Sequence, residues 1–164
     1  MTRRPACRRC TGFQPEFDLL DGGTLYDAIR YDDTVPLAHL IRPTYFTNLS
    51  IVPGNLELME FEHDTPRALS AQSGNLLFTR ISDALRAVEA NFDHVVIDCP
   101  LQRGFLTGSA LSAARAILVT LRPQLLDVMS MCQFLLMTSN LQGVVADAGG
   151  NMTYDWQQIG RAHV

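Results

Sequence analysis

The stretch that most constrains the fold is residues 94–100 (HVVIDCP), an apolar run that ends in an acid and a proline. Val95, Val96 and Ile97 are β-branched and favour a strand. A short run without polar alternation is typical of a strand buried on both faces of a parallel sheet. Asp98 would then lie at the carboxyl edge of that sheet, where open α/β sheets bind their ligands. The alternative is a structural strand end whose aspartate caps the next helix.

The flanking segments continue the α/β pattern. A helix over residues 76–91 is predicted by apolar residues at helical spacing, namely Leu77, Ile81, Leu85 and Val88. A helix from about residue 106 to 114 leads into a second apolar strand, residues 116–121. Two parallel strands joined by a helix form a βαβ unit. The sequence therefore predicts an incomplete doubly wound, mainly parallel sheet with helices on both faces.

The N-terminal half shows shorter elements. Thr24 is a suitable N-cap for a helix over residues 25–31, and Pro36 suits the first turn of a helix over residues 37–41. A strand is expected at residues 48–52, and a helix at residues 56–63. The last of these helices carries acids and a histidine that could suggest a metal or acid–base site. An ordinary solvated helix is the favoured interpretation; the residues are Glu57, Glu60, Glu62 and His63.

The longest predicted helix covers residues 124–146, and its apolar side chains occupy more than one face. Two interpretations stay open. The helix is either buried between the sheet and its neighbours, or it presents a surface to a partner or a second copy. Its methionines favour the second interpretation slightly.

The chain contains no lysine: all 13 of its basic residues are arginine. A glycine-rich phosphate loop needs a lysine at the β- and γ-phosphates, and the planar guanidinium of arginine does not replace a compact ammonium.

The net charge of −4 argues mildly against a dedicated nucleic-acid domain. Cys7 and Cys10 lack a second metal-ligand pair, and we interpret Cys99 and Cys132 as core thiols. Without a secretory signal or a transmembrane span, the expected compartment is the cytoplasm.

Residues 98–107 (DCPLQRGFLT) resemble the segment that follows the Walker B strand in ATPases of the ParA/MinD group. Three further sequence segments make the resemblance more specific, to the RepA partition ATPases of alphaproteobacterial plasmids. These segments are residues 12–18 (GFQPEFD), residues 52–63 (VPGNLELMEFEH) and residues 122–131 (RPQLLDVMSM). The resemblance covers roughly residues 12–156. It departs from the family at Leu101, where a second proline is usual, and at Arg103, where an apolar residue is usual.

The resemblance implies a P-loop NTPase fold of the deviant Walker A type and an intact parent that binds ATP and Mg²⁺. That parent would dimerise around nucleotide, bind DNA non-specifically and act with a ParB/RepB-like centromere-binding partner. Asp98 would hold Mg²⁺ through water, and Pro100, Gln102 and Gly104 would belong to a nucleotide-sensing switch loop. The intact parent is then an ATPase, whereas this chain alone is expected to be inactive. The alternatives are a non-catalytic repressor that binds DNA or a partner, and a truncated product without function.

The composition divides the chain into three parts. Residues 12–158 form the expected partial ParA/RepA-like domain, and residues 1–11 look non-native. One choice of codons for residues 1–12, read two bases later, encodes Asp-Pro-Gln-Ala-Ser-Leu-Ser-Ala-Leu-Tyr-Gly, the word that the family places at this point. Residues 1–11 are therefore hypothesised to be an out-of-frame reading. Residues 159–164 match the translation of a common sequencing adapter, so no role is assigned to them.

Overall fold

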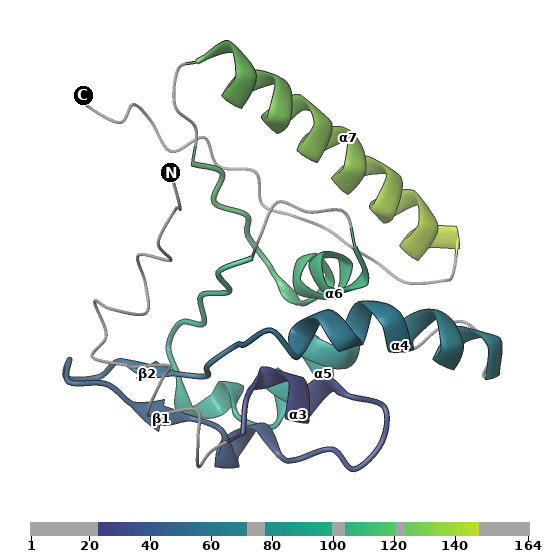
Figure 1. Cartoon of the computed structure of the whole chain (residues 1–164). Coiled ribbons are helices and arrows are strands. Elements are labelled where there is room, and N and C mark those ends of the chain that lie inside the picture. Colours follow the sequence, from purple (N-terminus) through teal and green to yellow (C-terminus); the bar gives the residue numbers. More distant parts are fainter. Residues whose placement is uncertain (1–22, 72–77, 100–103, 121–123, 148–164) are drawn as a thin grey trace. The chain divides into compact units, whose positions relative to one another are not determined.

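The computed structural model describes residues 23–71, 78–99, 104–120 and 124–147 (Figure 1). The chain divides into two compact units. The first contains residues 1–68 and 83–93, and the second contains residues 69–82 and 94–164. Each unit is considered by itself below.

The first unit begins with helix α3 (Leu25–Ile29), whose N-cap is Thr24 as predicted. The Asp27 carboxylate accepts a hydrogen bond of 2.8 Å from the Thr24 backbone N–H, which stabilises the first turn. The helix ends before residue 31, because the backbone of Arg30 leaves the helical region. The expected helix over residues 37–41 is a single 3-10 turn, η1 (Leu37–His39), and Pro36 is its N-cap.

A short hairpin follows, formed by β1 (Arg42–Pro43) and β2 (Ser50–Ile51). The strands are antiparallel, with Arg42 opposite Ile51 and Pro43 opposite Ser50. Asn48 adopts a left-handed backbone conformation in the connecting loop, with φ 62°. The prediction placed β2 within residues 48–52 but gave no strand at β1, since Arg42-Pro43 carries no local strand signal.

The core of the first unit is centred on Leu37, Leu40 and Val88, which are buried. Side chains from α3, from the segments that flank η1 and the hairpin, and from residues 83–93 pack around them; they are Leu25, Ala28, Val35, Ile41, Val52, Ala84 and Leu85. The Leu25 N–H also donates a 2.8 Å hydrogen bond to the carbonyl oxygen of Pro53, which fixes α3 to the segment after β2. Burial of these apolar groups is the main stabilising term of this unit.

Helix α4 (Leu58–Ala71) is longer than the predicted 56–63, and it continues through Pro66. A proline removes one helical hydrogen bond and usually ends or kinks a helix. Here the side chain of Thr65 donates a 2.6 Å hydrogen bond to the Phe61 carbonyl oxygen and accepts one of 3.0 Å from the Tyr31 hydroxyl. Phe61 is fully buried, and its ring stacks on Tyr31 with centroids 5.8 Å apart. These contacts stabilise the helix before and after residue 63, where it was predicted to end.

The predicted helix over residues 76–91 is broken. Helix α5 (Arg80–Arg86) is followed by a 3-10 turn, η2 (Glu89–Asn91), and residues 76–77 lie outside the described residues. In the second unit, α6 (Phe105–Ala113) and α7 (Leu125–Asp147) each begin and end within one residue of the predicted bounds. Among the helices of the described residues, none is long and apolar enough to cross a membrane.

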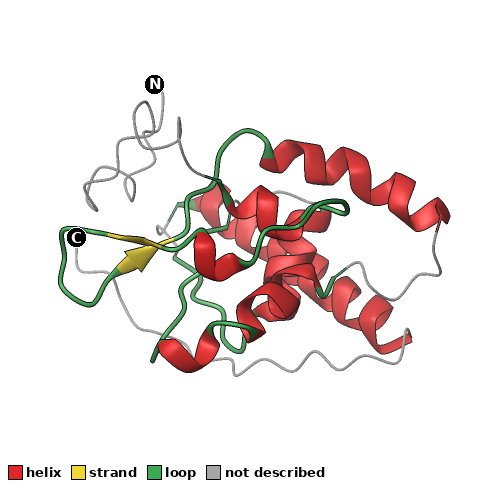
Figure 2. Ribbon diagram, turned by 90° about the horizontal axis from the view of Figure 1, so that it is seen from below, coloured by secondary structure: helices red, strands yellow, loops and turns green. Residues whose placement is uncertain are grey.

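The predicted parallel sheet is not formed by the residues that the structure describes. Their one sheet is the β1–β2 hairpin, drawn as two yellow arrows in Figure 2. Residues 94–98, expected as a buried strand, belong to no strand, and Val96 is 90% exposed. In the second expected strand, residues 116–121, Ala116 forms an isolated β-bridge and residues 117–120 belong to no strand, while residue 121 lies outside the described residues. The physical reason is that a strand needs a hydrogen-bonded neighbour, and no described segment supplies one to either stretch.

Candidate functional site

The candidate site begins at Asp98, whose side chain is exposed. The next residue is tied to helix α6: the Cys99 thiol lies 3.8 Å from the Thr107 hydroxyl, to which it donates a weak hydrogen bond. Thr107 lies in the first turn of α6 and is buried. The contact therefore places the Asp98 backbone one residue away from a group anchored at the N-terminal end of α6.

Helix α6 begins directly after Gly104, which is its N-cap residue. The Gly104 carbonyl oxygen accepts a 3.0 Å hydrogen bond from the Gly108 N–H, which closes the first turn. The N-terminal end of a helix carries the positive end of its dipole and favours negative charge nearby. Helix α6 thus begins within one residue of the predicted position, and the switch role of the loop before it stays a prediction.

The loop itself falls outside the described residues. Pro100 and Gln102, both predicted site residues, lie there together with Leu101 and Arg103. Of the predicted site residues, Asp98 and Gly104 are described, and they stand at the two ends of this loop. Their assignment to metal and nucleotide stays a prediction.

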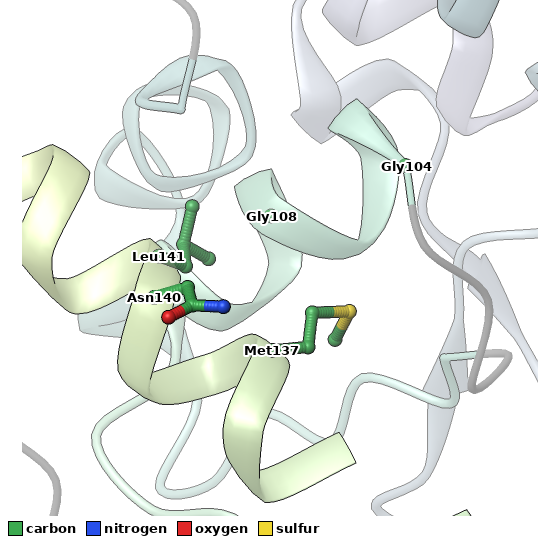
Figure 3. A pocket seen from close by; sticks show the side chains of 5 residues that line it. All are labelled: Gly104, Gly108, Met137, Asn140 and Leu141. Atoms are coloured by element: carbon green, nitrogen blue, oxygen red, sulfur yellow. The ribbon is translucent and has the colours of Figure 1, made fainter. Parts of the chain in front are cut away.

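A small cavity of about 150 Å³ lies between α6 and α7 (Figure 3). Gly104 and Gly108 line it from α6, whereas Met137, Asn140 and Leu141 line it from α7. In Figure 3 the three α7 side chains lie on the side of α7 that faces α6. The sequence motifs gave no indication of this cavity, although two glycines four residues apart, at the N-cap and within the helix, are a signal for close approach of another element.

Gly108 shows why that spacing matters. A β-carbon at Gly108 would lie 2.6 Å from Cε1 of Phe78 and 3.7 Å from Cδ1 of Leu141. The absence of a side chain therefore lets the aromatic ring approach the α6 backbone directly. Ser109, Ala110 and Leu111 are also buried, so α6 is enclosed along much of its length.

The residues present fit a magnesium ion better than a triphosphate. Mg²⁺ keeps several waters and is commonly held by one or two carboxylates together with substrate phosphates. A single exposed carboxylate such as Asp98 suits that role, and within the described ranges no three His, Cys, Asp or Glu side chains gather as a protein-only metal cage. The residues that would bind a triphosphate are missing, because the sequence contains neither a lysine nor a glycine-rich phosphate loop.

Comparison with known proteins identifies the family. The chain matches the AAA domain family over residues 11–147. It is 55% identical over 150 residues to the "Putative replication protein A" of Rhizobium rhizogenes, covering 90% of this chain and 37% of that protein. It is 36% identical over 100 residues to the chromosome partitioning protein ParA of Myxococcus xanthus, covering 61% of this chain and 32% of that protein.

A solved structure supports the same fold. The cobyrinic acid a,c-diamide synthase from Mycobacterium smegmatis, with bound ADP and magnesium, matches with a TM-score of 0.67 and 24% identity. The match covers 85% of this chain and 52% of that chain. The chain thus spans about a third of the length of these two relatives and about half of this structure. On these matches, the chain belongs to the AAA domain family of ParA/MinD-type ATPases, which have the P-loop NTPase fold.

Proposed function

We propose that this chain is part of a plasmid-partitioning ATPase of the ParA/RepA type. Asp98 would hold the water shell of Mg²⁺, and residues 100–104 would form the loop that senses the nucleotide. The observation that carries the proposal is the sequence of residues 98–107 joined to a helix that begins at Phe105, directly after Gly104. The family match and the names of the relatives support the same class of protein.

The chemistry assigned to Asp98 is organisation of the metal rather than attack on the phosphate. When bound, Mg²⁺ would supply positive charge that offsets the negative charge of the nucleotide's phosphates, and Asp98 would hold it through water. Asp98 contributes a negative charge at the exposed end of an apolar segment, and the Cys99–Thr107 contact fixes that end against α6.

The intact protein would bind ATP and Mg²⁺, dimerise, bind DNA and work with a ParB/RepB-like partner to segregate a plasmid. The phosphate loop would come from sequence outside these 164 residues. Residues 12–158 would be the native part of the domain, with residues 1–11 out of frame and residues 159–164 derived from an adapter.

The absence of lysine favours one further candidate, a non-catalytic repressor that binds DNA or a partner without turnover. Sequencing the source DNA across both ends distinguishes the two functions. An upstream frame that encodes Lys-Gly-Gly-x-Gly-Lys-Thr supports the ATPase. An uninterrupted frame through residues 1–12, with a ribosome-binding site ahead of Met1 and no phosphate loop, supports the repressor and refutes the frameshift.

A further inference from the structure

Thr107 lies in the first turn of α6, and its side chain is buried. Residues 107–111 form an unbroken buried run along the helix. Gly108 packs so closely against Phe78 that a β-carbon there would lie 2.6 Å from the ring. Because protein interiors are densely packed and resist displacement, a shift of α6 would force this ring to move. The Thr107 hydroxyl is therefore a fixed point at the start of α6.

The Thr107 hydroxyl holds the residue that follows Asp98. The Cys99 thiol donates a hydrogen bond to it, with 3.8 Å between Sγ and Oγ1. A thiol is a weak donor, but here its acceptor belongs to a buried side chain that packing keeps in place. Cys99 itself is only partly exposed. The contact therefore restrains the backbone directly after Asp98.

The Asp98 side chain is exposed, and no hydrogen bond or ion pair joins it to another described residue. The direction of its carboxylate is therefore set by the backbone on both sides. Strand pairing of residues 94–97 in a complete sheet would fix the backbone before the acid, but it would not fix the peptide after it. In metal sites, groups outside the coordination shell orient the ligands, and their loss costs affinity or activity. The Cys99–Thr107 hydrogen bond is placed to do this for Asp98.

We propose that Thr107 is a positioning residue for Asp98. Its hydroxyl holds the Cys99 thiol, and the Cys99 backbone in turn sets the direction of the Asp98 carboxylate. The inference rests on the proposed function, because it takes Asp98 as the residue that would hold Mg²⁺ through water. Thr107 is buried and acts through Cys99, not by contact with the ion or the nucleotide. Thr107→Ser and Cys99→Ser keep a hydroxyl for the hydrogen bond, whereas Thr107→Val and Cys99→Ala remove it.

The first experiment measures the hydrogen bond itself in the 164-residue chain. Cys99 becomes the sole thiol when the other three cysteines are replaced by serine, namely Cys7, Cys10 and Cys132. Its rate of reaction with Ellman's reagent at one fixed pH reports how accessible the thiol is. Thr107→Val should raise this rate about three- to tenfold, as expected for the loss of one weak hydrogen bond, and Thr107→Ser should leave it unchanged.

Thr138→Val is the matched control for the loss of a buried hydroxyl. Thr138 is a buried threonine in α7, and its hydroxyl donates a 3.0 Å hydrogen bond to the Phe134 carbonyl oxygen. This substitution should leave the reaction rate of Cys99 unchanged. Thermal unfolding checks that each variant remains folded. A reaction rate in Thr107→Val equal to that of the chain with Thr107 intact would overturn the proposal.

The second experiment uses the intact-length parent protein, with Mn²⁺ and ADP as probes and electron paramagnetic resonance as the readout. Thr107→Val should weaken Mn²⁺ binding to the ADP complex about tenfold, the lower end of the loss expected when a ligand's outer partner is removed. The Mg²⁺ concentration for half-maximal ATP hydrolysis should rise by a similar factor, whereas ADP binding without metal should stay the same. Thr107→Ser should behave like the parent, and Thr138→Val should change neither quantity.

A double-mutant cycle separates positioning from a general loss of stability. If Thr107 acts through Cys99, the double variant Thr107→Val/Cys99→Ala should bind Mn²⁺ no more weakly than Thr107→Val alone. Additive losses, or unchanged Mn²⁺ binding in a folded Thr107→Val variant, would refute the positioning role. Asp98→Ala is the reference in the same assays. If Asp98→Ala left Mn²⁺ binding intact, the proposed function would fail and this inference with it; if only Asp98→Ala weakened binding, the inference alone would fail.

Discussion

The ring of Phe78 lies against the backbone of Gly108, where a β-carbon would be only 2.6 Å from Cε1 and 2.8 Å from Cδ1 of the ring. This contact sets how closely the segment before α5 approaches α6, the helix that begins where the candidate switch loop ends. Packing at Gly108 therefore bears on the geometry of the proposed site as well as on stability.

Gly108→Ala should lower the free energy of unfolding by about 1–3 kcal/mol, because the added methyl group forces the Phe78 ring or the helix to move. Urea denaturation of the full chain measures the effect. Gly143→Ala is the matched control at an open helical position and should raise stability by up to about 1 kcal/mol at low protein concentration. Equal effects of the two substitutions would show that the Phe78–Gly108 contact is not tight.

Phe61→Ala should lower the free energy of unfolding by about 3–5 kcal/mol, because the ring is fully buried and stacks on Tyr31. The substitution also leaves a cavity beside the hydrogen bond between Tyr31 and Thr65. Met59→Ala removes a side chain that is 62% exposed in the same helix and should change stability little. The midpoints of thermal unfolding of the two variants measure the difference. Equal midpoints would contradict the packing described for α4.

Tyr26 makes stability depend on alkaline pH. Burial, followed by the 3.1 Å hydrogen bond from its hydroxyl to Asp64, raises the pKa of Tyr26 above its usual value of 10.0. A neutral acid whose pKa is raised on folding contributes stability below its unfolded pKa and loses that contribution as the pH rises through the folded value. The free energy of unfolding should therefore fall above about pH 10. Lysine side chains, which titrate in the same range, cannot cause this fall because the chain has none.

The measurement is urea denaturation at a series of pH values from neutral to strongly alkaline. Tyr26→Phe should flatten the alkaline decline while costing about 1 kcal/mol at neutral pH, because the Asp64 hydrogen bond is lost. Tyr45→Phe, at a side chain that is 64% exposed, is the control. A decline as steep in Tyr26→Phe as in the unmodified chain would assign the pH dependence to another group.

The chain by itself should not bind ATP tightly, because an isolated carboxylate at Asp98 cannot organise a triphosphate without a lysine and a phosphate cradle. Isothermal titration calorimetry of the purified chain with ATP and Mg²⁺ tests this expectation. Micromolar affinity would show that arginine residues or the loop after Asp98 bind phosphate in a way that the sequence does not reveal.

The helices that could be predicted from sequence are those with strong local signals. Helices α6 and α7 were placed within one residue at each end, and Thr24 was identified as the cap of α3. The predicted end of α4 at residue 63 was wrong: the helix continues through Pro66 to Ala71, and Thr65 and Tyr31 supply tertiary hydrogen bonds that the sequence does not show. Local chemistry thus predicted helix starts better than helix ends.

Strands depend on partners, which local signals cannot supply. Residues 94–98 have the composition of a buried strand, yet Val96 is exposed and no described segment pairs with it. The candidate site was predicted in the same partial way. The motif singled out Asp98 and Gly104, whose roles stay predictions, and it could not show the Cys99–Thr107 contact or the cavity between α6 and α7, which depend on packing between segments.

The most direct test of the proposed function is Mg²⁺-dependent ATP hydrolysis by the intact-length parent protein carrying Asp98→Ala or Asp98→Asn, with DNA and a ParB/RepB-like partner present. Because the Asp98 side chain is exposed, both variants should keep the melting temperature of the parent. Turnover should fall at least about a hundredfold, in line with the loss of a group that organises transition-state charge. Unchanged turnover in a folded Asp98→Ala variant would show that Asp98 is structural and would contradict the proposed function.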